Sequence, residues 1–201
     1  ARTADGLAAA HRDDIIHRDV KPDNIMLTKQ GDPKISDFGL AKRVLNSKGK
    51  PVAEEICGTP NYMAPELFQG KEASPASDVY ALGVTLYLAL TGRLPYQAKS
   101  LQQLRWKGRN EPIPNVRRVR SDVPLEVAEC VSMMTAPAPG NRPKNAIEAS
   151  QLLHAVLGQE RDLESLLIEA FRHKPGITWT RFGDSYTLIR SLPGDRKQTV
   201  F

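Results

Sequence analysis

One short polar segment, His17–Asn24, constrains this chain more than any other part of its sequence. It reads H-R-D-V-K-P-D-N. Six of its positions match a single loop pattern, H-R-D-x-K-P-x-N, which would occur by chance about once in tens of millions of positions. Two tripeptides, Asp37-Phe38-Gly39 and Ala64-Pro65-Glu66, follow in order. The ordered set is the informative signal, because a lone Asp-Phe-Gly carries no such weight.

The three motifs resemble, in order and separation, those of eukaryotic-type (Hanks-type) serine/threonine protein kinases. The resemblance covers roughly residues 1–157 and implies the helical C-terminal lobe of that fold. Only eighteen residues precede Asp19, too few for the glycine-rich loop, strand lysine and helix glutamate that the family uses to hold ATP. We therefore expect a C-lobe fragment of a longer gene product, nearly inactive alone. Its short, alanine-rich character resembles bacterial members.

The resemblance also assigns catalytic and ligand-binding roles. Asp19 would accept the proton of a substrate Ser or Thr hydroxyl, and Lys21 would reach the transferring γ-phosphate of ATP. Asn24 and Asp37 would hold Mg²⁺, which prefers hard oxygen ligands. Met26 would form the apolar floor under adenine. The catalytic residues would thus be Asp19, Lys21 and Asn24, and Lys21 at this place resembles the serine/threonine class.

Taken singly, these residues have simpler interpretations. An Asp–Asn pair in a loop often belongs to a turn. Lys21 alone could be a solvated surface residue, and Met26 could be core packing, because methionine fills irregular gaps readily. The kinase interpretation therefore depends on the whole set of motifs.

The resemblance further implies a supporting network. His17 would support the Phe38 ring, and Thr59 would bridge Asp19 and Lys21 by hydrogen bonds. In the family, an acidic group on the activation loop pairs with the arginine at position 18. Here Glu55 occupies the place where many kinases carry a phosphothreonine, so Glu55 could supply a standing charge; the alternative is that it faces water.

Deeper in the domain, Asp78 would accept backbone N–H groups of the catalytic loop, which would justify a buried carboxylate. Glu66 and Arg142 resemble a buried ion pair that ties the activation segment to the lobe. A substrate peptide would lie along residues 58–63 and a helix near residues 100–107.

The hydrophobic pattern predicts a mainly α fold with short β strands, followed by a small α+β antiparallel extension over residues 158–201. Ser77 or Asp78 is the expected N-cap of an apolar helix that runs to Leu90 and ends at Thr91–Gly92. Other helices are expected over 1–14, 64–68, 100–107, 125–134, 144–157 and 160–173, and strands over 25–27, 34–36, 177–182, 185–192 and 196–201.

Composition places the chain in a reducing compartment. The two cysteines form no disulfide or zinc pattern. The longest apolar stretch, Val79–Leu90, is too short to span a bilayer, and the N-terminus has no signal-peptide pattern. We expect a cytoplasmic domain without a membrane segment, although a parent chain could carry an anchor. The oligomeric state stays open.

Seven basic residues between Lys99 and Arg120, with Glu111 as the single acidic residue among them before Arg120, give the chain a local positive charge. Such a stretch can bind nucleic acid, anionic lipid or acidic peptides, or can simply be a solvated surface. We expect a protein substrate and no nucleic acid. The alternative function is a non-catalytic half-kinase that docks partners through its basic helix.

Overall fold

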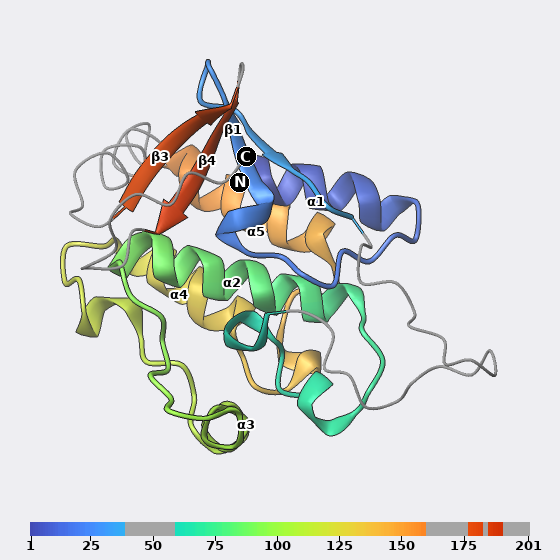
Figure 1. Ribbon diagram of the computed structural model, residues 1–201, viewed down its shortest axis with the longest axis vertical. Helices are drawn as coiled ribbons and strands as arrows, with labels where there is room; N and C mark the ends of the chain where they lie inside the picture. The colour runs from blue at the N-terminus through green and yellow to red at the C-terminus, as the bar shows by residue number, and fades with distance from the viewer. Residues whose placement is uncertain (39–58, 160–176, 183–184, 191–201) are drawn as a thin grey trace.

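The computed structural model describes residues 1–38, 59–159, 177–182 and 185–190. These residues form a mainly helical domain with one antiparallel sheet at its end (Figure 1). The predicted mainly α fold with short strands is therefore confirmed. The α helices are α1 (Arg2–Arg12), α2 (Pro75–Thr91), α3 (Leu101–Asn110), α4 (Leu125–Met134) and α5 (Ala146–Gln159), and the short 3-10 helices are η1 (Pro22–Asn24), η2 (Pro60–Tyr62), η3 (Leu67–Gln69), η4 (Val116–Arg118) and η5 (Pro139–Asn141).

The central helix α2 is buried on nearly all sides, which is why its sequence is apolar around the whole helix. Its N-cap is Ser74, whose side chain accepts the Ser77 N–H, while Ser77 returns a bond to the Ser74 N–H. The prediction that Ser77 or Asp78 caps this helix was wrong, because Pro75 fits the first helical position and lets the helix begin one turn earlier. The predicted end is confirmed: Gly92 has φ 72° and closes the helix in the left-handed region.

The main core lies where α1, α2, α4 and α5 meet. Leu7 of α1, Val79 and Leu82 of α2, and Met134 of α4 are buried in one cluster with Ala149 of α5. At Gly83 the helices approach so closely that an added Cβ would lie 2.7 Å from Thr135 Cγ2 and 2.9 Å from Met134 Cβ. This packing holds α2 firmly under the loop that follows α1.

Four strands form the sheet: β1 (Ile25–Thr28), β2 (Pro33–Ile35), β3 (Ile177–Phe182) and β4 (Ser185–Arg190). Their order is β2-β1-β4-β3, and all neighbours are antiparallel. Met26 of β1 lies opposite Lys34 on one side and Thr187 on the other. The C-terminal hairpin thus extends the sheet that begins beside the His17–Asn24 loop, a pairing that the sequence did not predict.

Most predicted elements are confirmed within a few residues at each end. The predicted helix over 64–68 differs: a short 3-10 turn, η3, ends at Gly70, whose φ of 76° closes it. Of the strand predicted over 185–192, residues 185–190 are confirmed as β4, and residues 191–192 lie outside the described residues. The helix predicted over 160–173 and the strand over 196–201 lie outside the described residues. In the part of the chain that the structure describes, no helix is long and apolar enough to cross a membrane.

Candidate active site

Asp19 lies at the centre of a compact set of polar contacts. Lys21 Nζ lies 2.7 Å from Asp19 Oδ2 and donates to Thr59 Oγ1 at 2.8 Å. Thr59 in turn donates to Asp19 Oδ1 from its backbone N, at 2.9 Å, and from its hydroxyl, at 3.0 Å. The predicted bridge from Thr59 to Asp19 and Lys21 is therefore confirmed. It joins two loops that lie far apart in the sequence.

These contacts favour the ionised form of Asp19. Partial burial opposes ionisation, but the hydrogen bonds from Lys21 and Thr59, together with the Lys21 charge, outweigh it, so the pKa of Asp19 is lowered. The carboxylate is consequently ionised throughout the neutral range. An ionised, half-buried carboxylate can orient a hydroxyl group and accept its proton late in a reaction.

Asn24 presents an amide oxygen beside this carboxylate. Its Nδ2 donates to Asp19 O at 2.8 Å and to Asp19 Oδ2 at 3.3 Å, so the amide is held in one orientation. Within the described residues, no group donates to Asn24 Oδ1. Asp37 is exposed and also offers carboxylate oxygens. This donor set of one amide and one carboxylate oxygen fits a hard cation such as Mg²⁺.

The described residues contain no group of three or more His, Cys, Asp or Glu side chains that could hold a metal by themselves. A cation at Asn24 and Asp37 would therefore need further ligands from a phosphate or from water. Magnesium binds in that way, because it usually keeps several non-protein oxygen ligands.

Ser36 connects the two candidate metal-binding residues. Its backbone N donates to Asn24 O at 2.9 Å, and its hydroxyl lies 3.3 Å from Asp37 Oδ2. Asp37 has φ 60°, a left-handed conformation that aspartate tolerates better than most residues. Ser36 thereby helps to fix where Asp37 lies relative to Asn24. The sequence analysis missed this residue.

The His17 ring is completely buried and uses both nitrogens. Its Nε2 donates to Ser36 O at 2.7 Å, and its Nδ1 accepts the Asp19 N–H at 3.3 Å. Its centroid lies 4.8 Å from that of Phe38. The predicted supporting contact between His17 and Phe38 is confirmed. The same ring also aligns the backbone of Asp19.

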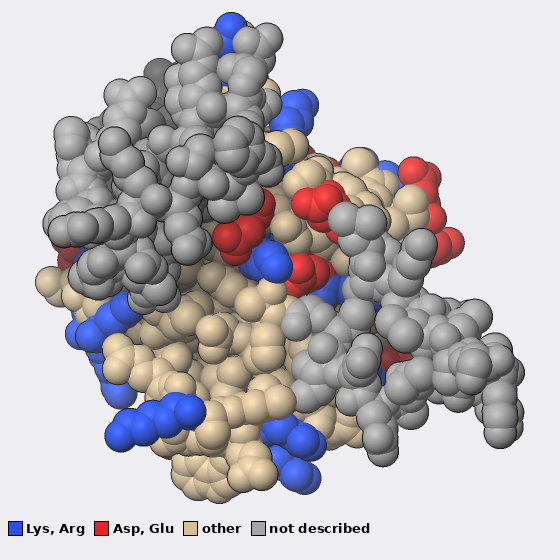
Figure 2. Space-filling model, viewed as in Figure 1, with Lys and Arg blue, Asp and Glu red and all other residues tan. Residues whose placement is uncertain are grey.

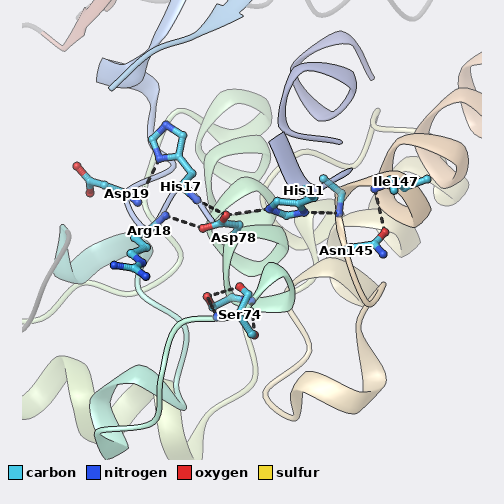
Figure 3. Close-up of polar contacts among 10 residues, drawn as sticks. His11, His17, Arg18, Asp19, Ser74, Asp78, Asn145 and Ile147 are labelled. Atoms are coloured by element: carbon cyan, nitrogen blue, oxygen red, sulfur yellow. Dashed lines mark hydrogen bonds and ion pairs between the residues drawn. The ribbon is translucent and has the colours of Figure 1, made fainter. Parts of the chain in front are cut away.

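Asp78 anchors the backbone just before Asp19 (Figure 3). It accepts the His17 N–H at 2.7 Å and the Arg18 N–H at 2.9 Å, as predicted. Arg18 has φ 70°, and a bulky residue in that region costs on the order of 1–3 kcal/mol. The buried carboxylate therefore holds the loop in a conformation that the chain would not otherwise favour.

His11, which the sequence analysis missed, completes this anchor. Its Nε2 lies 3.0 Å from Asp78 Oδ2, and its Nδ1 accepts the Ala146 N–H at 3.0 Å. Since Nδ1 accepts a hydrogen bond, Nε2 carries the ring proton and donates a hydrogen bond to Asp78 (Figure 3). The signal was present in the sequence, because His11 falls on the same helical face as the buried Leu7 and Ala8.

Glu66 and Arg142 form a buried ion pair. Arg142 donates from Nη1 and Nη2 to the two carboxylate oxygens of Glu66, at 2.7 and 2.9 Å. It also donates to the Ala136 and Pro137 carbonyls and stacks on the Tyr80 ring, 4.7 Å from its centroid. The predicted ion pair is confirmed. It fixes the Ala64-Pro65-Glu66 segment against the helical core.

Two other predicted features stand differently. Met26 is half-buried in β1 with a backbone partner on each side, and its role under adenine stays a prediction. Glu55 lies outside the described residues, so its proposed pairing with Arg18 stays a prediction too.

Comparisons with known proteins agree with this geometry. The model of the family described as "Protein kinase domain" matches residues 1–162. Serine/threonine-protein kinase PknK of Mycobacterium tuberculosis is 39% identical over 160 residues, which is 77% of this chain and 14% of that protein. PknL of the same species is 36% identical over 167 residues, 83% of this chain and 40% of that protein.

PrkC of Bacillus subtilis is 35% identical over 140 residues, 70% of this chain and 22% of that protein. The chain thus spans less than half the length of each of these relatives. All three come from bacteria, in agreement with the bacterial character expected from the sequence.

Proposed function

We propose, from the premise that this chain belongs to the protein kinase family, that it carries the catalytic loop of a serine/threonine kinase. The substrates would be ATP and a protein with a Ser or Thr hydroxyl. Residues 1–157 would form the helical lobe on which phosphoryl transfer takes place. The names of the relatives and the lysine at position 21 support the choice of serine/threonine acceptors.

Each of these side chains would have its own role in the reaction. Asp19 orients the acceptor hydroxyl and takes its proton while that oxygen bonds to the γ-phosphorus and the bond to the β–γ bridging oxygen breaks. Lys21 stabilises the charge on the transferring group as a point charge. Asn24 and Asp37 would hold Mg²⁺, which when bound neutralises the phosphate charge.

One observation carries this proposal more than the others. The contacts with Lys21 and Thr59 lower the pKa of the Asp19 carboxyl group, and the Asn24 amide is fixed against the same residue. A carboxylate that served only as a turn residue would not need these contacts from its own loop and from the distant segment that carries Thr59.

The test is phosphorylation of Ser- and Thr-containing peptides by the protein encoded by the complete reading frame that contains this chain. Asp19→Asn should lower kcat by about 10²–10⁴-fold, the usual contribution of a general base. Activity should require Mg²⁺ and should yield phosphoserine or phosphothreonine.

Asp13→Asn is the matched control. Asp13 is exposed at the end of α1, and its substitution removes the same charge as Asp19→Asn does. It should keep parental activity, and both variants should unfold at similar temperatures. Equal activity of Asp19→Asn and the parent would overturn the assignment. Phosphotransfer that appears only on tyrosine would overturn the acceptor class.

A further inference from the structure

The structure places α3 next to the segment that carries Thr59. η2 follows Thr59 directly, and α3 packs against η2. Leu104 of α3 is buried with Met63 and Phe68 in a small apolar cluster. Because Thr59 is hydrogen-bonded to Asp19, one short element separates α3 from the candidate catalytic carboxylate. A chain whose hydroxyl lay at Asp19 could therefore extend onto α3.

The exposed surface of α3 is basic and partly apolar. Leu101, Arg105 and Arg109 follow one another at intervals of four residues, so they form one row along the helix. Trp106 projects beside this row with 58% of its surface exposed, and Leu101 is 41% exposed. Lys99 precedes the helix. Figure 2 shows Lys and Arg side chains gathered where α3 lies, with no acidic side chain among them on that face.

The structure also separates this surface from the rest of the basic stretch. Arg120 donates to Leu90 O, at the end of α2, and pairs with Asp122. Arg117 donates to Val123 O. These two arginines tie η4 to the helical core, so their charge has a structural use. Two basic residues of α3 also have structural contacts: Arg105 donates to Phe68 O, and Lys107 pairs with Glu111. Among the described residues, the basic side chains of this surface without such a contact are Lys99 and Arg109.

We infer that α3 is a docking surface for an acidic segment of the protein substrate. Lys99 and Arg109 would bind Asp or Glu side chains near the phosphorylated residue, and Trp106 would contact an apolar side chain in the same segment. Charge complementarity is the reason for this choice of partner. The inference rests on the proposed phosphotransfer only in placing the acceptor hydroxyl at Asp19.

A binding experiment tests this without any phosphoryl transfer. Fluorescence anisotropy would compare two labelled peptides, each with one central serine and one leucine, flanked either by glutamates or by lysines. The chain should bind the glutamate peptide at least 10-fold more tightly, and its affinity should fall as salt is raised. The double variant Lys99→Glu/Arg109→Glu should lose at least 10-fold in affinity for that peptide.

Arg118→Glu is the control for charge alone. Arg118 is exposed on η4, which packs against α2 and α4. This variant should keep most of the affinity for the acidic peptide. Equal losses in the control and in the double variant would overturn the inference, as would equal binding of the two peptides by the parent chain. Circular dichroism would confirm that both proteins are folded.

Trp106→Ala tests the apolar contact separately. The variant should weaken binding of the leucine-containing peptide but leave binding of a matched alanine peptide unchanged. A loss that is the same for both peptides would overturn the role of Trp106. Since none of these measurements uses ATP, failure of phosphotransfer with the complete protein would not affect them, and the two proposals can be tested independently.

Discussion

His11 Nε2 lies 3.0 Å from Asp78 Oδ2, and both side chains are almost completely buried. This contact joins the end of α1 to α2, while the other nitrogen of the ring holds the start of α5 through the Ala146 N–H. The same carboxylate fixes the backbone of His17 and Arg18. One buried aspartate thus links the position of the His17–Asn24 loop to the packing of three helices.

His11→Ala should lower the free energy of unfolding by about 2–4 kcal/mol. The substitution leaves the Ala146 N–H without its partner, at a cost of about 1–3 kcal/mol, and it removes a buried ring. Urea denaturation would measure the change. His154→Ala is the comparison, because His154 is largely exposed on α5, and it should change stability by less than about 1 kcal/mol. A similar loss in both variants would contradict the role given to His11.

Glu66→Ala should destabilise the protein by about 3–5 kcal/mol, because Arg142 would remain buried without its carboxylate partner. Thermal and urea unfolding would measure the loss. Glu72→Ala removes an exposed carboxylate nearby and should have an effect of no more than about 0.5 kcal/mol. If the two variants were equally stable, the ion pair would not be holding the segment that contains Glu66.

Gly83→Ala and Gly108→Ala should have opposite effects. At Gly83 an added Cβ would clash with Met134 and Thr135 across the helix interface, which costs about 1–3 kcal/mol. At Gly108, inside α3, nothing lies within 4 Å of the added Cβ. Alanine should therefore raise stability there by about 0.5–1 kcal/mol through its better helix propensity. Differential scanning calorimetry of the pair checks both signs; a stabilising Gly83→Ala would refute the close packing.

Lys21→Met should raise the pKa of Asp19. Burial acts to raise this pKa, and the Lys21 and Thr59 contacts hold it below its ordinary value of 3.8. The folded-state pKa is depressed, so the ionised carboxylate contributes stability that is present above its ordinary pKa and is lost as pH falls through the folded value. In the variant this loss should begin at a higher pH.

Carbon-13 NMR titration of the Asp19 carboxyl group would measure the change in pKa directly. Lys34→Met is the control, because Lys34 is an exposed lysine on β2, and the Asp19 titration should not move. An unchanged titration in Lys21→Met would mean that the contact with Lys21 does not set the charge of Asp19.

The local motifs made much of the site predictable. The bridge through Thr59 and the Glu66–Arg142 pair follow from residues at characteristic places in their motifs. His11 and Ser36 were missed because their roles come from tertiary contacts: His11 bonds to residues of α2 and to the start of α5, and Ser36 bonds through both its backbone and its hydroxyl. The helical spacing of His11 from Leu7 and Ala8 indicates that its side chain is buried, but it does not show which residues the ring contacts.

The secondary structure was likewise predictable where it depends on local sequence and unpredictable where it depends on tertiary contacts. Apolar periodicity located the helices, but the predicted N-cap of α2 was Ser77 or Asp78, whereas the helix is capped by Ser74. Alternating residues indicated β3 and β4, yet the pairing of β4 with β1 could not be read from either strand alone. Register between segments far apart in the chain depends on where the rest of the fold brings them.

The pairing of β4 with β1 has a consequence for synthesis of this protein. Met26 leaves the ribosome long before Thr187, its backbone partner. During that interval the nascent chain carries a strand with an open edge, which other chains can join. Chaperone dependence and aggregation during expression should therefore be governed by the delay before the terminal hairpin arrives.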